Sequence, residues 1–185
     1  GKFVNGVLGS VYKEIGEPGK DTPKRTEKKV IDPKTLPLDM LVGAVVYARV
    51  PDADDADGHA QYQLALVHDI FGHWTLSKGH LKEGETEEIG LKRILKEEMV
   101  LEGGVIKGEL ASNEYIANDP EKGGKLRKQV KYFLVEAPFA PISLGKPGGL
   151  DDAKWFPLSA SADLNFYNDI LPIITKAVTT LLKAE

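Results

Sequence analysis

The sequence predicts an α/β protein in which a mixed β-sheet lies between helices, as an α/β/α sandwich. Two observations lead to this fold class. Strand-like patterns stand both before and after a central helical segment, and a second amphipathic helix follows them near the end of the sequence. With 185 residues, of which 42% are hydrophobic and 28% are charged, the chain can form one domain with a sizeable core.

The first forty residues differ from the rest of the chain. They are rich in Lys, Glu, Pro and Gly and lack an apolar period, so we expect an extended arm or linker over 1–40 and a folded domain over 41–185. A β-branched run at 41–50 and an alternating pattern at 61–69 predict two strands. The acidic turn between them, 51–60, lacks the ligand spacing of an EF-hand, which favours a solvated hairpin tip.

A central helix is predicted from Thr86, whose hydroxyl can cap the helix N-terminus. Gly103 and Gly104 are expected to end it. Apolar residues four positions apart predict the row that faces the core. This row consists of Leu91, Leu95 and Met99.

Three strands and a helix are predicted after this point. The strands cover 105–117, 129–137 and 153–159, and the helix covers 168–185. A basic loop, 118–128, separates the first two strands. Pro172 is compatible with the final helix only near its first turn.

Composition excludes several classes of function. A net charge of −4 argues against partners such as bulk nucleic acid or an anionic membrane, and no apolar run reaches the roughly 20 residues that span a bilayer. The absence of cysteine excludes disulfides, thiolate zinc sites and a cysteine nucleophile. It is also consistent with a reducing compartment, so we expect a cytoplasmic protein. The oligomeric state stays open between a monomer and a homodimer.

Two adjacent acids on the central helix, Glu97 and Glu98, lie beside the predicted core row rather than opposite it. Carboxylates held together near a core edge repel each other and lose hydration, and a divalent cation such as Mg²⁺ or Mn²⁺ offsets that cost. Glu85 can add a third oxygen ligand, and Arg93 is spaced to pair with Glu97. The alternative is an ordinary amphipathic helix with solvated glutamates.

The spacing of these residues resembles the Nudix box, G-x5-E-x7-R-E-U-x-E-E-x-G-U, in which U is aliphatic. The positions that match are Gly79, Glu85, Arg93, Leu95, Glu97, Glu98 and Leu101. Three further segments, "WTLSKGHLKEGE", "QVKYFLVE" and "AKWFPLS", resemble the diadenosine- and diphosphoinositol-polyphosphate branches of that family. The resemblance covers residues from about 41 to 183.

The resemblance implies a Nudix-type sandwich and a metal-dependent hydrolase. Such an enzyme cuts a phosphoanhydride bond in a nucleoside polyphosphate or another nucleoside diphosphate-linked substrate. By position, Glu97 and Glu98 would be catalytic metal ligands, with Glu85 as a further ligand of Mg²⁺ or Mn²⁺. Arg93 would orient the carboxylates, and Gly79 would let the loop bend against the helix, with Leu95 and Leu101 as structural positions of the box.

Two positions depart from the box. Ile94 stands where the family has a glutamate, on the helical face that carries the paired acids, and Val100 replaces the box glycine. Nearby, Ser77 replaces a proline, and Lys82 replaces a loop acid. The alternative to an enzyme is therefore a catalytically impaired Nudix module that binds a phosphorylated ligand or a protein partner.

Several basic and aromatic residues are candidates for substrate binding. Lys78 is expected to contact a phosphate, and Lys125 and Arg127, with Lys128 beside them, to clamp a polyphosphate, unless the basic loop is simply solvated. Tyr132 can stack on a base or face the core.

Three further residues complete the set of candidates. Asp151 and Asp152 could supply a late carboxylate as a base or ligand, although acids are common in turns. His80 is expected to be structural, because no second histidine lies at metal-ligand spacing from it.

Overall fold

The computed structural model describes residues 32–54, 60–119, 122–146 and 148–183. Residues 33–185 form one compact unit. Residues 1–31 of the predicted arm and residues 55–59 of the predicted hairpin tip lie outside the described residues, so both stay predictions. Among the described residues, no helix is long and apolar enough to cross a membrane.

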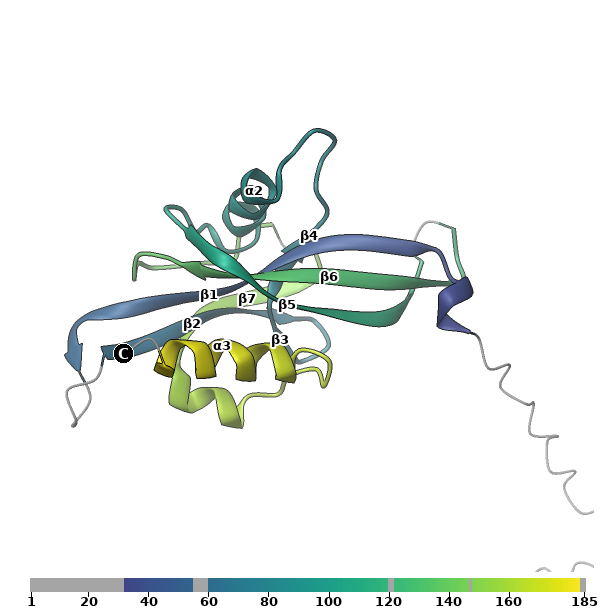
Figure 1. Cartoon of the computed structure of the whole chain (residues 1–185). Coiled ribbons are helices and arrows are strands. Elements are labelled where there is room, and N and C mark those ends of the chain that lie inside the picture. Colours follow the sequence, from purple (N-terminus) through teal and green to yellow (C-terminus); the bar gives the residue numbers. More distant parts are fainter. Residues whose placement is uncertain (1–31, 55–59, 120–121, 147, 184–185) are drawn as a thin grey trace, which may run out of the picture. The chain divides into compact units, whose positions relative to one another are not determined.

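Seven strands and two α-helices make up the described chain (Figure 1). The strands are β1 (Leu38–Asp54), β2 (Ala60–Asp69), β3 (Trp74–Thr75), β4 (Ser77–Gly79), β5 (Val105–Asn118), β6 (Lys125–Glu136) and β7 (Leu150–Pro157). The α-helices are α2 (Glu87–Met99) and α3 (Leu171–Lys183), and the short 3-10 helices are η1 (Pro33–Thr35) and η2 (Leu158–Asp163).

The strands form a single mixed sheet. Its main path runs β3-β2-β1-β6-β5, with β4 paired to β1 and β7 paired to β2. Strands β1 and β6 are parallel, from Leu38 beside Arg127 to Tyr47 beside Glu136, and the other pairings are antiparallel. The predicted mixed sheet is confirmed.

The two α-helices cover opposite faces of the sheet (Figure 1). Along β1 the side chains alternate between two separate cores, as the period of two in a strand requires. Val45 and Tyr47 join the core beneath α3, whereas Ala44 and Val46 join the core beneath α2. This arrangement confirms the α/β/α sandwich.

Helix α2 starts as predicted but ends earlier. The Thr86 hydroxyl accepts a hydrogen bond from the Ile89 amide, and all three residues of the predicted core row are buried. The helix stops at Met99, because Val100 adopts a left-handed conformation with φ of 52° and its amide donates to the Leu95 carbonyl. Gly103 therefore lies beyond the helix end and does not terminate it.

Candidate functional site

The loop before α2 is fixed to the helix by one arginine. Arg93 donates through Nε and a terminal nitrogen to the two oxygens of Glu85, both at 2.7 Å, and also to the His80 carbonyl oxygen at 2.9 Å. The Lys82 amide donates to Glu85 at 2.8 Å. The hydrogen bonds from Arg93 lower the pKa of Glu85 to about 2, so Glu85 is ionised at neutral pH.

Glu97, near the end of α2, has weaker contacts with two cations. One oxygen lies 3.4 Å from Arg93, which confirms the predicted pair, and the other lies 3.4 Å from the Lys146 ammonium. Although desolvation raises its pKa, Lys146 and Arg93 together bring the pKa of Glu97 below the ordinary value. Its side chain is 31% exposed, so this carboxylate stays accessible to an added cation.

Glu98 lies in a different environment. It is half-buried and accepts hydrogen bonds from the Ser77 hydroxyl at 2.5 Å and from the Lys78 amide at 3.3 Å. Desolvation raises the pKa of Glu98, and these donors oppose the shift only in part. A desolvated carboxylate whose hydrogen-bond donors are a hydroxyl and a backbone amide is a favourable position for a cation.

The three predicted metal ligands do not come together as one group. Within the part of the chain that the structure describes, no three or more His, Asp or Glu side chains are arranged to hold a metal. Glu85 is instead occupied by Arg93 and Lys82. Glu97 and Glu98 remain, and two carboxylates suit a Mg²⁺ ion that takes its other ligands from water and substrate phosphates.

The structure corrects the expected position of Ile94. Its side chain is 4% exposed and packs in the core beneath α2, instead of lying on an open face with the two acids. The reason is the close approach of β4, since a methyl group placed on Gly79 would lie 3.1 Å from Ile94 Cδ1. Gly79 therefore makes room for the isoleucine, and a carboxylate at position 94 would have to enter this apolar space.

A pocket of about 500 Å³ lies on the α3 side of the sheet, within the usual size of ligand sites. Its lining includes aromatic residues, one lysine and two acids: Asp69, Phe71, Thr75, Lys78, Tyr115, Ile116, Ala117, Tyr132, Tyr167, Asp169 and Ile170. Desolvation lowers the pKa of Lys78, against the opposing effect of Glu98. Because adjacent residues of a strand face opposite ways, β4 directs Ser77 to Glu98 and the Lys78 side chain into this pocket.

Tyr132 is not placed to stack on a base. It is fully buried in the core beneath α3, because β6 alternates between the two cores and residue 132 falls on the α3 side. Its hydroxyl borders the pocket and is among the buried polar atoms that have no hydrogen-bond partner in the described residues. Phe71, which is 74% exposed and also lines the pocket, is the more accessible ring.

The predicted phosphate clamp lies within β6 rather than in a loop. Lys125 donates to the Asn118 side chain at 2.7 Å, Arg127 lies 3.4 Å from Glu114, and Lys128 pairs with Asp39 at 3.6 Å. None of the three lines the pocket that contains Lys78. The structure does not bring them together with the carboxylates of α2.

The remaining candidates also have partners of their own. Asp151 pairs with His68 at 2.6 Å, and Asp152 pairs with Lys154. His80 contacts Asp39 at 2.7 Å, which agrees with the structural role expected for it. The two acids lie on β7, which pairs with β2 and not with the strands next to α2.

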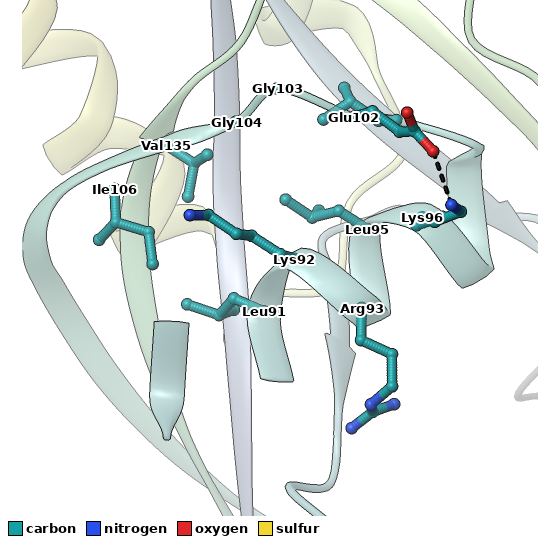
Figure 2. Close-up of a pocket in the computed structure, with 11 residues that line it drawn as sticks. Leu91, Lys92, Arg93, Leu95, Lys96, Glu102, Gly103, Gly104, Ile106 and Val135 are labelled. Carbon is teal, nitrogen blue, oxygen red and sulfur yellow. Dashed lines mark ion pairs between the residues drawn. The ribbon is translucent and has the colours of Figure 1, made fainter. Parts of the chain in front are cut away.

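A second cavity, of about 260 Å³, lies between α2 and the start of β5 (Figure 2). Apolar side chains such as Leu91, Leu95 and Ile106 line it, while the Arg93 guanidinium points away from it. Its polar rim includes Lys96, which pairs with Glu102 at 2.7 Å. Neither Glu97 nor Glu98 lines this cavity, so we do not assign it to the candidate site.

Two residues at the site were not predicted as functional. Ser77 was noted only as a departure from a motif, and its bond to Glu98 spans 21 positions of the sequence. Lys146 comes from the Pro- and Gly-containing connection between β6 and β7, which carries no periodic signal. No sequence signal places this connection next to the helix that carries the acids.

Comparison with known proteins gives one family. The sequence model of the NUDIX domain matches residues 50–176, which is more than half of the chain. No curated protein sequence matches this chain.

Solved structures with this fold include two hydrolytic enzymes and a NUDIX domain complexed with ADP ribose. The binary complex of C. elegans Ap4A hydrolase is 21% identical, covers 78% of this chain and 98% of its own, and has a TM-score of 0.56. The NUDIX domain of Shewanella oneidensis NrtR, complexed with ADP ribose, is 21% identical, covers 82% and 94%, and has a TM-score of 0.60. The E. coli dihydroneopterin triphosphate pyrophosphohydrolase is 17% identical, covers 76% and 95%, and has a TM-score of 0.53.

Proposed function

The chain belongs to the Nudix family, and on this premise we propose that it hydrolyses a phosphoanhydride bond in a nucleoside polyphosphate or another nucleoside diphosphate-linked compound. The observation that carries the proposal is the position of Lys78. Its backbone amide donates to Glu98, while its side chain lines the aromatic pocket. One residue thus connects the aromatic pocket to the carboxylates of the box.

In this proposal, some residues of the site bind the substrate, and others hold the metal or position the acids. Lys78 binds a phosphate in the pocket, and the accessible ring of Phe71 supports a base. Arg93 holds Glu85 and lies next to Glu97, which limits the rotamers of both acids. Glu97 and Glu98 would hold a Mg²⁺ or Mn²⁺ ion, which when bound supplies positive charge to the phosphates. In the reaction, water forms a new P–O bond and the bridging P–O bond breaks.

A second function is favoured by one observation, the burial of Ile94. Its position takes a carboxylate away from the box, so a module that binds the same ligands without cleaving them is the alternative. Both functions use the pocket around Lys78, and they differ in turnover alone.

The test separates binding from hydrolysis. A panel that includes Ap4A, ADP-ribose and nucleoside triphosphates is assayed with Mg²⁺ and with Mn²⁺, and binding is measured by calorimetry. We expect Lys78→Met to weaken binding at least tenfold, as loss of a half-buried charge-assisted contact does. Lys176→Met, at an exposed lysine of α3 outside this pocket, serves as the matched control and should bind normally.

A second variant, Glu98→Gln, tests the role of the box carboxylate in hydrolysis. We expect it to keep binding and to lower turnover by about 10² or more, as removal of a group that acts in the transition state does. Binding without turnover in the unmodified chain would establish the module instead. No binding of any compound in the panel would contradict both functions.

A further inference from the structure

The connection between β6 and β7 is attached to the last turn of α2. The Gly145 amide donates to the Glu98 carbonyl at 2.9 Å, and the Lys146 amide donates to the Glu97 carbonyl at 2.6 Å. Carbonyls at the end of a helix have no partner within it, so these amides satisfy groups that would otherwise face solvent. The connection therefore acts as a cap that fixes its own position relative to the two acids.

A close approach at Gly145 makes this attachment possible. A Cβ atom on this residue would overlap the backbone carbonyl of Glu97, which cannot move without distorting the helix. A residue with a side chain at this position would push the connection away from α2. The glycine thus brings the next residue, Lys146, directly beside Glu97.

The Lys146 side chain turns this proximity into an ion pair. Its ammonium lies 3.4 Å from one oxygen of Glu97, and the other oxygen lies 3.4 Å from Arg93. Arg93 is held at 2.7 Å by Glu85, so Lys146 is the cation that is not already committed to a closer carboxylate. The Lys146 side chain is 75% exposed, and an exposed ion pair of this kind exchanges easily.

We infer that Lys146 is the protein's own counter-ion for Glu97 and competes with a divalent cation for this carboxylate. This inference rests on the proposed function, which assigns Glu97 and Glu98 to the metal. A metal alone must displace Lys146 and finds only two carboxylates. A metal that arrives with a phosphate finds additional oxygens, and the phosphate offers the displaced ammonium a new partner. Binding of the metal and binding of the phosphate ligand therefore strengthen each other, and Lys146 determines how large this coupling is.

The first experiment measures Mn²⁺ binding to the full chain by electron paramagnetic resonance, with Mn²⁺ as the only added ligand. We expect Lys146→Met to tighten Mn²⁺ binding about fivefold, the upper range for removal of an exposed ion pair. Lys96→Met is the matched control, because it removes an exposed lysine of α2 that pairs with Glu102 and not with Glu97. An equal gain in both variants would reduce the effect to net charge and overturn the inference.

The second experiment moves the lysine without removing it. Gly145→Ala should displace the connection and tighten Mn²⁺ binding in the same direction as Lys146→Met. In both variants, the gain in Mn²⁺ affinity on adding inorganic tripolyphosphate should be smaller than in the unmodified chain. Unchanged coupling in Lys146→Met would overturn the inference, and its melting curve would show whether the variant is folded.

The failure of the inference can be told from the failure of the proposed function. If Mn²⁺ binds the unmodified chain and Lys146→Met equally, and Glu97→Gln abolishes that binding, the metal site stands and the role of Lys146 is wrong. If Glu97→Gln leaves Mn²⁺ binding unchanged in both backgrounds, the metal lies elsewhere. The metal part of the proposed function is then wrong, and the inference falls with it.

Discussion

At the start of α2, Glu85 is held by two nitrogens of Arg93 at 2.7 Å, whereas near its end Glu98 is half-buried beside a hydroxyl and a backbone amide. The pKa of Glu85 falls to about 2, while the pKa of Glu98 rises. The same motif thus places one carboxylate where its charge is compensated and another where its charge is costly. Glu85 thus serves to hold the loop in place, whereas Glu98 is suited to bind a cation.

The end of the helix also contains the backbone strain of this region. Val100 is the one non-glycine residue with positive φ among the described residues, at a position where the Nudix box has a glycine. Strain and uncompensated charge tend to collect at functional sites, where the surrounding structure holds them in place. The start of α2, in contrast, has a capping threonine and a complete ion pair.

The largest expected effect comes from Ile94→Glu, which adds an acid between the two regions. Because Ile94 is buried against Gly79, we expect the new carboxylate to lower the free energy of unfolding by about 3 kcal/mol. Ile89→Glu, on an exposed position of the same helix, is the control and should change stability little.

Metal should reveal whether the new acid can reach the site. If the carboxylate introduced by Ile94→Glu could join Glu97, millimolar Mg²⁺ would raise the melting temperature of the variant more than that of the unmodified chain. Turnover per folded molecule would then rise as well. A folded variant with normal stability would show that position 94 has room for a carboxylate, contrary to the packing.

The second prediction breaks the start of the helix. Arg93→Met leaves Glu85 without its two-pronged partner and frees the loop before α2, so the melting temperature should fall clearly. Lys92→Met, which removes an exposed pair with Glu88, should leave it unchanged.

Acid titration refines this second test. The lowered pKa of Glu85 contributes stability above the unfolded pKa near 4.5, and this contribution is lost as the pH falls toward about 2. Arg93→Met should remove that part of the acid dependence. A variant that keeps the full loss of stability between these pH values would mean that other groups cause it.

The sequence was sufficient for the type and order of the main elements, although not for all their bounds, and for the side chains whose environment is local. The row of Leu91, Leu95 and Met99 follows from the helical period, and the Thr86 cap follows from residue chemistry. The mixed sheet needed only the order of strands and helices. The core row and the cap depend on residues within a few positions of one another, and the mixed sheet depends on the order of the elements along the chain.

The errors at the candidate site concern contacts between distant segments. Ile94 looks like part of an acidic face on a helical wheel, but in the fold it packs against the strand that carries Gly79 and joins the core beneath α2. Strand alternation predicts that Tyr132 faces one side of the sheet, but not which side is closed. The Lys146 contact depends on the path of a connection that contains no regular pattern.

The third prediction concerns the costly charge at the end of α2. Because the folded pKa of Glu98 is raised, its contribution to stability is complete below the unfolded pKa near 4.5 and is lost as the pH rises through the folded pKa. Glu98→Gln should therefore melt at a higher temperature than the unmodified chain at pH 8, and the two should converge near pH 4. Added Mg²⁺ should narrow the difference at pH 8, because it stabilises the ionised Glu98 alone. A difference independent of pH would assign the effect to packing instead.

The smallest expected effect comes from Val100→Gly. A β-branched residue in the left-handed region costs about 1–2 kcal/mol, and glycine removes this cost but loses about 0.5–1 kcal/mol of backbone entropy. The net gain should be about 0.5–1 kcal/mol, or roughly 1–4 °C in melting temperature for a domain of this size. Val105→Gly, at an exposed position of β5, should destabilise slightly, because it adds only the entropy loss.

Val100→Gly also tests whether the backbone strain at Val100 affects metal binding, because it leaves the charged residues of the site unchanged. Val100 is 51% exposed, and its substitution removes neither an acid nor a cation of the site. If strain at the helix end only reflects the lost glycine, Mn²⁺ affinity should stay the same while stability rises. A change in Mn²⁺ affinity would mean that the left-handed valine sets the position of Glu97 and Glu98. The contrast between the two ends of α2 would then extend from charge to backbone conformation.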